Sequence, residues 1–155
     1  EGDFFSARAV NVAPKPAKAL DIWLGGAAPA AFRRIGALGD GWLGSFLTPT
    51  EARHGREAIA AAADAAGRQI EPDHYGINIA VGDGRVPPYV LEATRRRRPD
   101  LDPSDVIATD WPQLHRMLDG YVAAGLTKFV IRPVGTGTTD AFVNTFCAEL
   151  LARQN

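Results

Sequence analysis

Four short apolar runs alternate along this chain with longer segments that carry helical periodicity. The runs are rich in β-branched and aromatic residues and are bounded by glycine, proline or polar turns, so they predict strands. They cover residues 21–24, 41–46, 75–81 and 127–132. Because strands alternate with helices, the sequence predicts an α/β fold with a parallel sheet and right-handed crossover connections.

The segments between the runs contain recognisable helix starts and ends. Thr48-Pro49-Thr50-Glu51 has the pattern of a capping box with proline at the first helical position, and its helix is expected to continue to about Ala66. Asp110-Trp111-Pro112-Gln113 has the same pattern, and Gly125 is expected to end its helix. The other predicted helices are 30–38, a segment that begins at 87–88 and carries Arg95–Arg98, and 139–152.

Four βα units are half of a (β/α)8 barrel. We predict one segment over residues 1–155, in which 1–18 form an N-terminal arm and 19–155 form the four units. Four parallel strands would leave two sheet edges unpaired. We therefore expect a missing N-terminal half-barrel or a second copy of the chain to pair with them. The absence of an initial methionine agrees with a fragment.

Composition argues against several classes of function. A net charge of −1 gives no broad basic surface for nucleic acid, and no apolar run approaches the roughly 18 residues of a membrane span. Without a signal peptide, a cytoplasmic protein is expected. Cys147 lies in an apolar periodic segment and is predicted to be buried. His54, His74 and His115 have no second ligand at metal spacing, so we predict no metal site.

Gly25-Gly26 ends the first predicted strand, and Pro29 suits the first turn of the helix that follows. Glycine places no Cβ between a ligand and the backbone amides, and a helix N-terminus favours an anion by about 0.3–1 kcal/mol. The spacing matches neither the Rossmann nor the P-loop fingerprint. From these residues alone, a simple tight turn and a phosphate site both remain open.

Several stretches resemble the C-terminal half of the bacterial luciferase-like flavin monooxygenase superfamily, and most closely its deazaflavin-dependent branch. The resemblance rests on Phe4-Phe5, Pro14-Lys15-Pro16, 22–26, 38–43 and 121–133. It implies that the four strands are the fifth to eighth of a TIM (β/α)8 barrel. It also implies that the cofactor is coenzyme F-420, with FMN as the alternative.

In relatives, the turn after the fifth strand holds the phosphate of the cofactor side chain. The resemblance therefore assigns cofactor binding to Gly25, Gly26 and Ala27, with Ala28 as a further candidate. The first four strands supply much of the wall around the redox ring in this family, including the catalytic positions. No catalytic residue is assigned here, and the chain alone is expected to be inactive.

Two residues are candidates for contact with substrate. Arg132 ends the last predicted strand, where its guanidinium could hold a carboxylate or phosphate or form a salt bridge at the rim. Ser45 follows the second strand and could donate a hydrogen bond. Arg95–Arg98 are either a solvated helix end or part of an insert that covers the site and binds an anionic substrate or the acidic cofactor tail. Gly135–Thr138 keep open a second phosphate position, after the last strand.

The leading hypothesis is an oxidoreductase that transfers a hydride between this cofactor and an unknown small organic substrate, as a homodimer. One alternative is a non-catalytic half-barrel module that dimerises through its open sheet edges. The other is a two-component FMN-dependent monooxygenase.

Overall fold

The computed structural model describes residues 2–8, 10–11, 13–135 and 137–153. Its centre is a parallel sheet, in which β1 (Trp23–Gly25), β2 (Gly41–Ser45) and β3 (Tyr75–Val81) are consecutive neighbours. The strand β5 (Lys128–Pro133) pairs with the other edge of β3. The predicted parallel sheet is confirmed. The first strand begins at Trp23 rather than Asp21, because its partner strand begins at Gly41, opposite Trp23.

One strand was not predicted. The strand β4 (Ile107–Ala108) follows the 3-10 turn η1 (Pro103–Asp105) and pairs with Ala80 and Val81. The same two residues pair with β5 on the opposite edge. The strand β4 therefore lies on the β2 side of β3, beyond the point where β2 ends. Two residues are too few to show a periodic pattern, so the sequence carries no signal for this strand.

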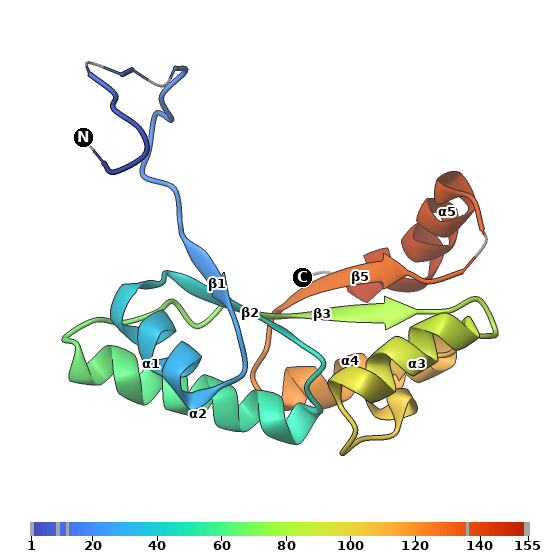
Figure 1. Ribbon diagram of the computed structural model, residues 1–155. Helices are drawn as coiled ribbons and strands as arrows, with labels where there is room; N and C mark the ends of the chain where they lie inside the picture. The colour runs from blue at the N-terminus through green and yellow to red at the C-terminus, as the bar shows by residue number, and fades with distance from the viewer. Residues whose placement is uncertain (1, 9, 12, 136, 154–155) are drawn as a thin grey trace.

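In the described part of the chain, five α-helices accompany the sheet (Figure 1). In Figure 1, α1, α2 and α4 lie along one side of the sheet, and α5 stands beyond β5. After α5 the chain ends in the 3-10 turn η2 (Leu151–Arg153). The helices are α1 (Pro29–Leu38), α2 (Pro49–Ala65), α3 (Pro88–Arg97), α4 (Trp111–Ala123) and α5 (Thr139–Leu150).

The two expected capping boxes differ. Thr48 accepts a hydrogen bond from the Glu51 backbone, and Glu51 accepts one from the Thr48 backbone, as predicted. Asp110 likewise accepts from the backbone of Gln113, but the Gln113 side chain accepts from Thr109 instead of Asp110. The second box is therefore only half formed.

Alternation along β3 divides its two faces. Tyr75, Ile77 and Ile79 join the main core together with side chains from α2 and α4. Gly76, Asn78 and Ala80 point to the opposite face. That face corresponds to the interior of a barrel, and it carries Ser45 beside Asn78 and Arg132 beside Ala80.

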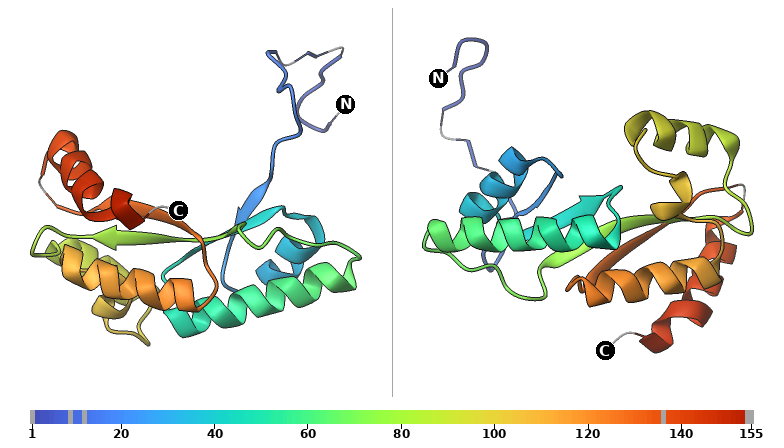
Figure 2. Two further views of the ribbon diagram at one scale, coloured as in Figure 1. Left: turned by 180° about the vertical axis from the view of Figure 1, so that it is seen from behind. Right: turned by 90° about the horizontal axis from the view of Figure 1, so that it is seen from below.

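The N-terminal arm extends away from the sheet (Figure 2), and the C-terminal helix α5 exposes a cysteine that was expected to be buried. The N-terminal arm projects from β1 (Figure 2), and Phe4 and Phe5 are 89% and 88% exposed. Cys147 is exposed, so the prediction of a buried thiol was wrong. The residues Phe142, Phe146 and Leu150, spaced four apart, turn α5 toward the core, and Cys147 lies off that stripe.

Gly36 marks a close approach between α1 and α2. A Cβ there would lie 2.6 Å from the Cβ of Ala62 and 2.7 Å from the carbonyl oxygen of Ile59. Backbone atoms cannot move aside as a flexible side chain can, so Gly36→Ala is expected to lower the free energy of unfolding by about 1–3 kcal/mol. Urea denaturation checks this, with Ala37→Ser on the exposed side of α1 as the control. Equal stability of the two variants would contradict the close approach.

Candidate functional site

The turn from β1 to α1 presents open backbone amides. Gly26 has φ of 127°, and a Cβ at this position would lie 2.7 Å from the Cβ of Ala31. Residues 25–28 are all exposed. Within the described chain, the backbone N–H groups of Gly26, Ala27 and Ala28 donate no hydrogen bond. Ala28 is the N-cap of α1 and offers no capping side chain, so these donors remain available to a ligand.

The turn is held in place by Trp42. The indole Nε1 of this fully buried residue donates to the carbonyl of Gly26 at 2.9 Å. Its ring meets Phe32 edge to face, with the ring centroids 5.7 Å apart. The sequence predicts Trp42 within a strand but carries no sign of this contact, because nothing local links its indole to a carbonyl sixteen residues earlier.

Asp40, just before β2, has a structural role. Its carboxylate accepts from the backbone of Ile22 at 2.9 Å and pairs with Arg68 at 3.0 Å. The Asp40 carbonyl lies 2.8 Å from Nδ1 of His74, which places this histidine in the same structural cluster. His115 lies 2.9 Å from Glu149 on the surface. Among the described residues, no group of three or more potential metal ligands occurs.

A pocket of about 290 Å³ opens at the carboxyl ends of the strands. It brings together Ser45 and Arg132, the two substrate-contact candidates, from strands on either side of β3. Asn78 lies between them on the same face, and sequence analysis missed it. Its Oδ1 is buried and has no hydrogen-bond partner in the described chain. The available signal was a single amide inside the apolar run of β3. The wall opposite the sheet includes Tyr89, Val90, Ala93 and Arg97 from α3.

The arginines in the run Arg95–Arg98 have different surroundings. Arg96 pairs with Glu92 on the exposed side of α3. Arg97 places its guanidinium 4.9 Å from the ring centroid of Phe46 and lines the pocket. Arg98 turns toward the loop after β2. Arg97 remains exposed, as a solvated helix end would be, whereas Arg98 is half-buried in contacts with the protein, and α3 covers part of the strand ends. Anion binding by this insert stays a prediction.

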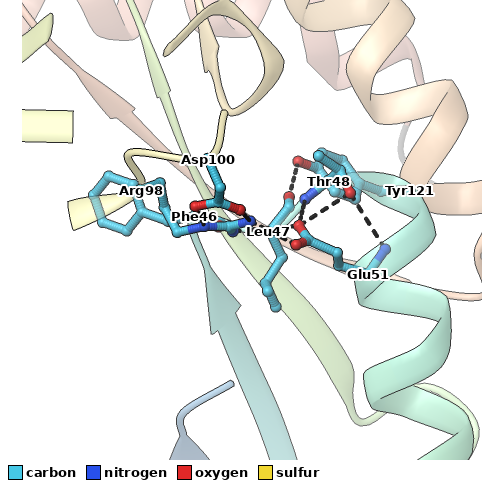
Figure 3. A network of polar contacts seen from close by, with 7 residues as sticks. All are labelled: Phe46, Leu47, Thr48, Glu51, Arg98, Asp100 and Tyr121. Atoms are coloured by element: carbon cyan, nitrogen blue, oxygen red, sulfur yellow. Dashed lines mark hydrogen bonds and ion pairs between the residues drawn. The ribbon is translucent and has the colours of Figure 1, made fainter. Parts of the chain in front are cut away.

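Arg98 joins the α3 segment to the loop between β2 and α2 (Figure 3). Its guanidinium donates to Glu51 at 2.5 Å, to Asp100 at 2.8 Å and to the carbonyl of Phe46. From the other side, the Tyr121 hydroxyl donates to the carbonyl of Leu47 at 2.6 Å. The loop that follows Ser45 is thus fixed by partners from two distant segments.

The charges in this network support one another. Burial acts to raise the pKa of Glu51, but hydrogen bonds from Arg98 and Thr48 outweigh it and hold the pKa below 4.5. Hydrogen bonds to Asp100 and Glu51 raise the pKa of Arg98, so it stays charged. Burial raises the pKa of Tyr121 above its ordinary value, which keeps the phenol as a neutral donor.

Replacing Arg98 with glutamine is expected to loosen α3. The change removes the ion pairs that fix the helix end, so amide hydrogen exchange over 88–97 should accelerate about tenfold or more, with little change in α4. The matched control is Arg96→Gln, which lies two residues away and has only an exposed partner. Equal exchange in the two variants would contradict the anchoring role.

Low pH should also loosen α3 in the wild type. Because the pKa of Glu51 is lower in the folded chain, its stabilisation is complete above about pH 4.5 and is lost as pH falls through the folded value. Protection of 88–97 should therefore decline below that pH in the wild type. In Arg98→Gln the decline should be smaller, because only the Thr48 hydrogen bonds still lower the pKa of Glu51, and exchange measured between pH 3 and 6 would show this.

The sequence keeps open a second phosphate position after the last strand, at 135–138. Within this segment Thr136 lies outside the described residues. Gly135, Gly137 and Thr138 line a separate pocket of about 360 Å³, together with Arg85 and Asp83. The Thr138 hydroxyl already accepts from the backbone of Ala141 as the cap of α5. This position stays a prediction.

Comparisons with known proteins place this geometry in a family. Within the described residues, the helices are all too short or too polar to cross a lipid bilayer. No curated protein matches the chain. Several solved structures share its fold at low sequence identity.

An F-420-dependent secondary alcohol dehydrogenase, solved with an F-420–acetone adduct, has a TM-score of 0.72 and 15% identity, covering 100% of this chain and 55% of its own. The F-420-dependent tetrahydromethanopterin reductase of Methanopyrus kandleri has a TM-score of 0.63 and 13% identity, covering 88% of this chain and 51% of its own. The EDTA monooxygenase of Chelativorans sp. BNC1 has a TM-score of 0.60 and 16% identity, covering 99% and 48%.

The chain thus spans about half the length of the solved structures that it matches. These similarities confirm the predicted fold, a part of a (β/α)8 barrel. The model of the luciferase-like monooxygenase family matches residues 1–85, which is more than half of the chain. The chain therefore belongs to the luciferase-like monooxygenase family.

Proposed function

We propose that this chain is the C-terminal half of a luciferase-like oxidoreductase that transfers a hydride between coenzyme F-420, or FMN in its place, and a small organic substrate. The observation that carries the proposal is the exposed turn at Gly25–Ala28, with three backbone donors that have no partner in the described chain. Membership of the family and the F-420-dependent enzymes among the similar structures support it.

The turn fits a phosphate group. Gly26 has a conformation that side chains disfavour, and a Cβ there would press against Ala31. The N–H groups of Gly26, Ala27 and Ala28 would donate to the phosphate of the cofactor side chain, assisted by the N-terminus of α1. When bound, the cofactor supplies the redox chemistry, and the chain supplies binding and orientation.

Substrate would bind in the pocket at the strand ends. Arg132 can hold an anionic group and Ser45 can donate a hydrogen bond, and both line the same pocket. The helix α3 forms its outer wall and would limit access of water to the reacting atoms. The phosphate turn and the pocket both lie at the carboxyl edge of the sheet, which is where barrel enzymes place their sites.

Completion of the site requires another half-barrel. In the described chain β1 pairs only with β2 and β5 only with β3, which leaves one edge of each unpaired. We propose that a first half-barrel pairs with these edges and supplies the catalytic residues, and that the chain alone is inactive. Homodimerisation of the complete protein and a cytoplasmic location are part of the same proposal.

Cofactor titration tests the proposal. The longer gene product, identified by intact mass, is titrated with F-420 and with FMN while the cofactor absorbance and fluorescence are followed. One of the two should saturate a single site per barrel, and binding of neither would refute the assignment. Oxygen consumption with reduced FMN would identify the two-component monooxygenase instead.

The open edges also favour a second candidate, a non-catalytic module that dimerises through them. Light scattering after size-exclusion chromatography separates the two. A stable dimer of the short chain that binds neither cofactor would support the module. A monomer that gains cofactor binding when the first half-barrel is supplied would support the enzyme.

A further inference from the structure

We infer that Arg97, Arg132 and Asn78 form a binding site for a small organic anion, a carboxylate or phosphate that also carries a hydroxyl or amino group. The inference rests on the proposed function and names the class of its substrate. It adds Asn78 from β3 to the contacts predicted from the sequence, and it selects Arg97 from the four arginines of the α3 segment. All three line the pocket at the strand ends.

The pocket carries positive charge without compensation. Arg97 and Arg132 line it, and no Asp or Glu is among its lining residues. Within the described chain, neither guanidinium forms an ion pair or a hydrogen bond to protein. Arg96 and Arg98, which flank Arg97 in the sequence, both have carboxylate partners. Two unpaired cations on one concave surface attract an anion and can bind it through charge-assisted hydrogen bonds.

Arg97 is held ready for this role. Its guanidinium lies over the ring of Phe46, at 4.9 Å from the centroid. This contact uses no hydrogen bond, so the guanidinium N–H groups remain free to donate. The adjacent Arg98 fixes this end of α3 to Glu51 and Phe46. Arg97 therefore projects from an anchored helix end, which lowers the entropy lost when it binds a ligand.

Asn78 adds a second requirement for the ligand. Its Oδ1 is buried and lacks a donor in the described chain. It lies beside Ser45 in the sheet and two residues before Ala80, which is opposite Arg132. Buried amide groups are normally satisfied, so this one calls for a polar group on the ligand. Val90 and Ile107 form an apolar part of the wall, and the volume of about 290 Å³ suits a small molecule.

Anion titration of the chain tests the site without the cofactor. The probes are 3-hydroxybutyrate, butyrate, which lacks the hydroxyl, and 1,3-butanediol, which lacks the charge. Binding is followed through the arginine Nε–Hε and backbone amide signals in NMR spectra at low ionic strength. We expect affinity in the order hydroxybutyrate, butyrate, butanediol, with the Nε–Hε signals of Arg97 and Arg132 shifting.

Four variants complete the experiment. Arg97→Gln and Arg132→Gln should each weaken hydroxybutyrate binding by roughly three- to tenfold, since each removes one charge-assisted contact in a partly exposed pocket. Arg96→Gln, the matched control, should bind like the wild type. Asn78→Ala should bind hydroxybutyrate and butyrate equally. Equal affinity in Arg96→Gln and Arg97→Gln, or no saturation by either anion, would overturn the inference.

The anionic tail of the cofactor could supply the same chemistry, and a second titration distinguishes it from substrate. In the longer protein, Arg97→Gln is titrated with F-420 and with its deazaflavin core lacking phosphate and glutamate. Unchanged affinity for both supports a substrate site. Weaker binding of the tailed form alone would overturn the substrate assignment. If the longer protein binds neither form of the cofactor, the proposed function is refuted. The anion titration of the short chain would still test the anion site by itself.

Discussion

Replacing Trp42 with alanine is expected to lower the free energy of unfolding by about 3–5 kcal/mol, as truncation of a large buried aromatic typically does. Trp42 is 0% exposed and packs between α1 and α2, against Phe32 and close to Gly55. Neither helix can collapse into the space left, because Gly36 already brings their backbones into contact. Domains of this size have a free energy of unfolding of about 5–15 kcal/mol in total, so the loss should remove a large part of the stability.

Trp42→Phe separates packing from the hydrogen bond to the turn. Phenylalanine retains much of the buried volume but cannot donate to the Gly26 carbonyl, so we expect a smaller loss of about 1–2 kcal/mol. Chemical denaturation followed by circular dichroism measures both variants. Leu38→Ala, at a side chain that is 68% exposed, is the control and should change stability little. A Trp42→Ala variant as stable as that control would show that the indole is not part of the core.

Local patterns were sufficient for most of the helices and strands. Thr48 and Glu51 lie three residues apart, so their capping box could be recognised from the sequence and is present. The strand β4 could not be predicted, because its two residues become a strand only through pairing with Ala80 and Val81. Cys147 was predicted to be buried and is exposed, since an apolar segment does not specify which side of a helix meets the core.

The candidate site was only partly predictable for the same reason. Ser45 and Arg132 were selected because strand ends converge at one edge of a parallel sheet, and they do line one pocket. Asn78 lies within a strand, so its isolated amide gained meaning only when the register placed it beside Ser45. Arg97 and Arg98 are adjacent in the sequence and have different surroundings, which depend on a loop about fifty residues away.

Gly26→Val is expected to weaken cofactor binding in the longer protein by about 10- to 100-fold. Its Cβ would lie 2.7 Å from that of Ala31, and φ of 127° disfavours a β-branched residue, so the turn must change conformation. The amides of Ala27 and Ala28 would then leave the positions in which we propose that they bind one phosphate. Each hydrogen bond lost to a charged group is worth about 1.5–3 kcal/mol, or roughly one order of magnitude or more in affinity.

A matched control separates this effect from backbone strain. Gly67 also has positive φ, 67°, but it lies just beyond the end of α2, and a Cβ there would have no neighbouring atom within 4 Å. Gly67→Val should therefore cost stability without changing the affinity for F-420 or FMN. The deazaflavin core without its phosphate should bind the Gly26→Val variant as well as it binds the wild type. If Gly26→Val instead binds the intact cofactor normally, the phosphate lies elsewhere, and the turn after β5 at Gly135 and Gly137 becomes the position to test.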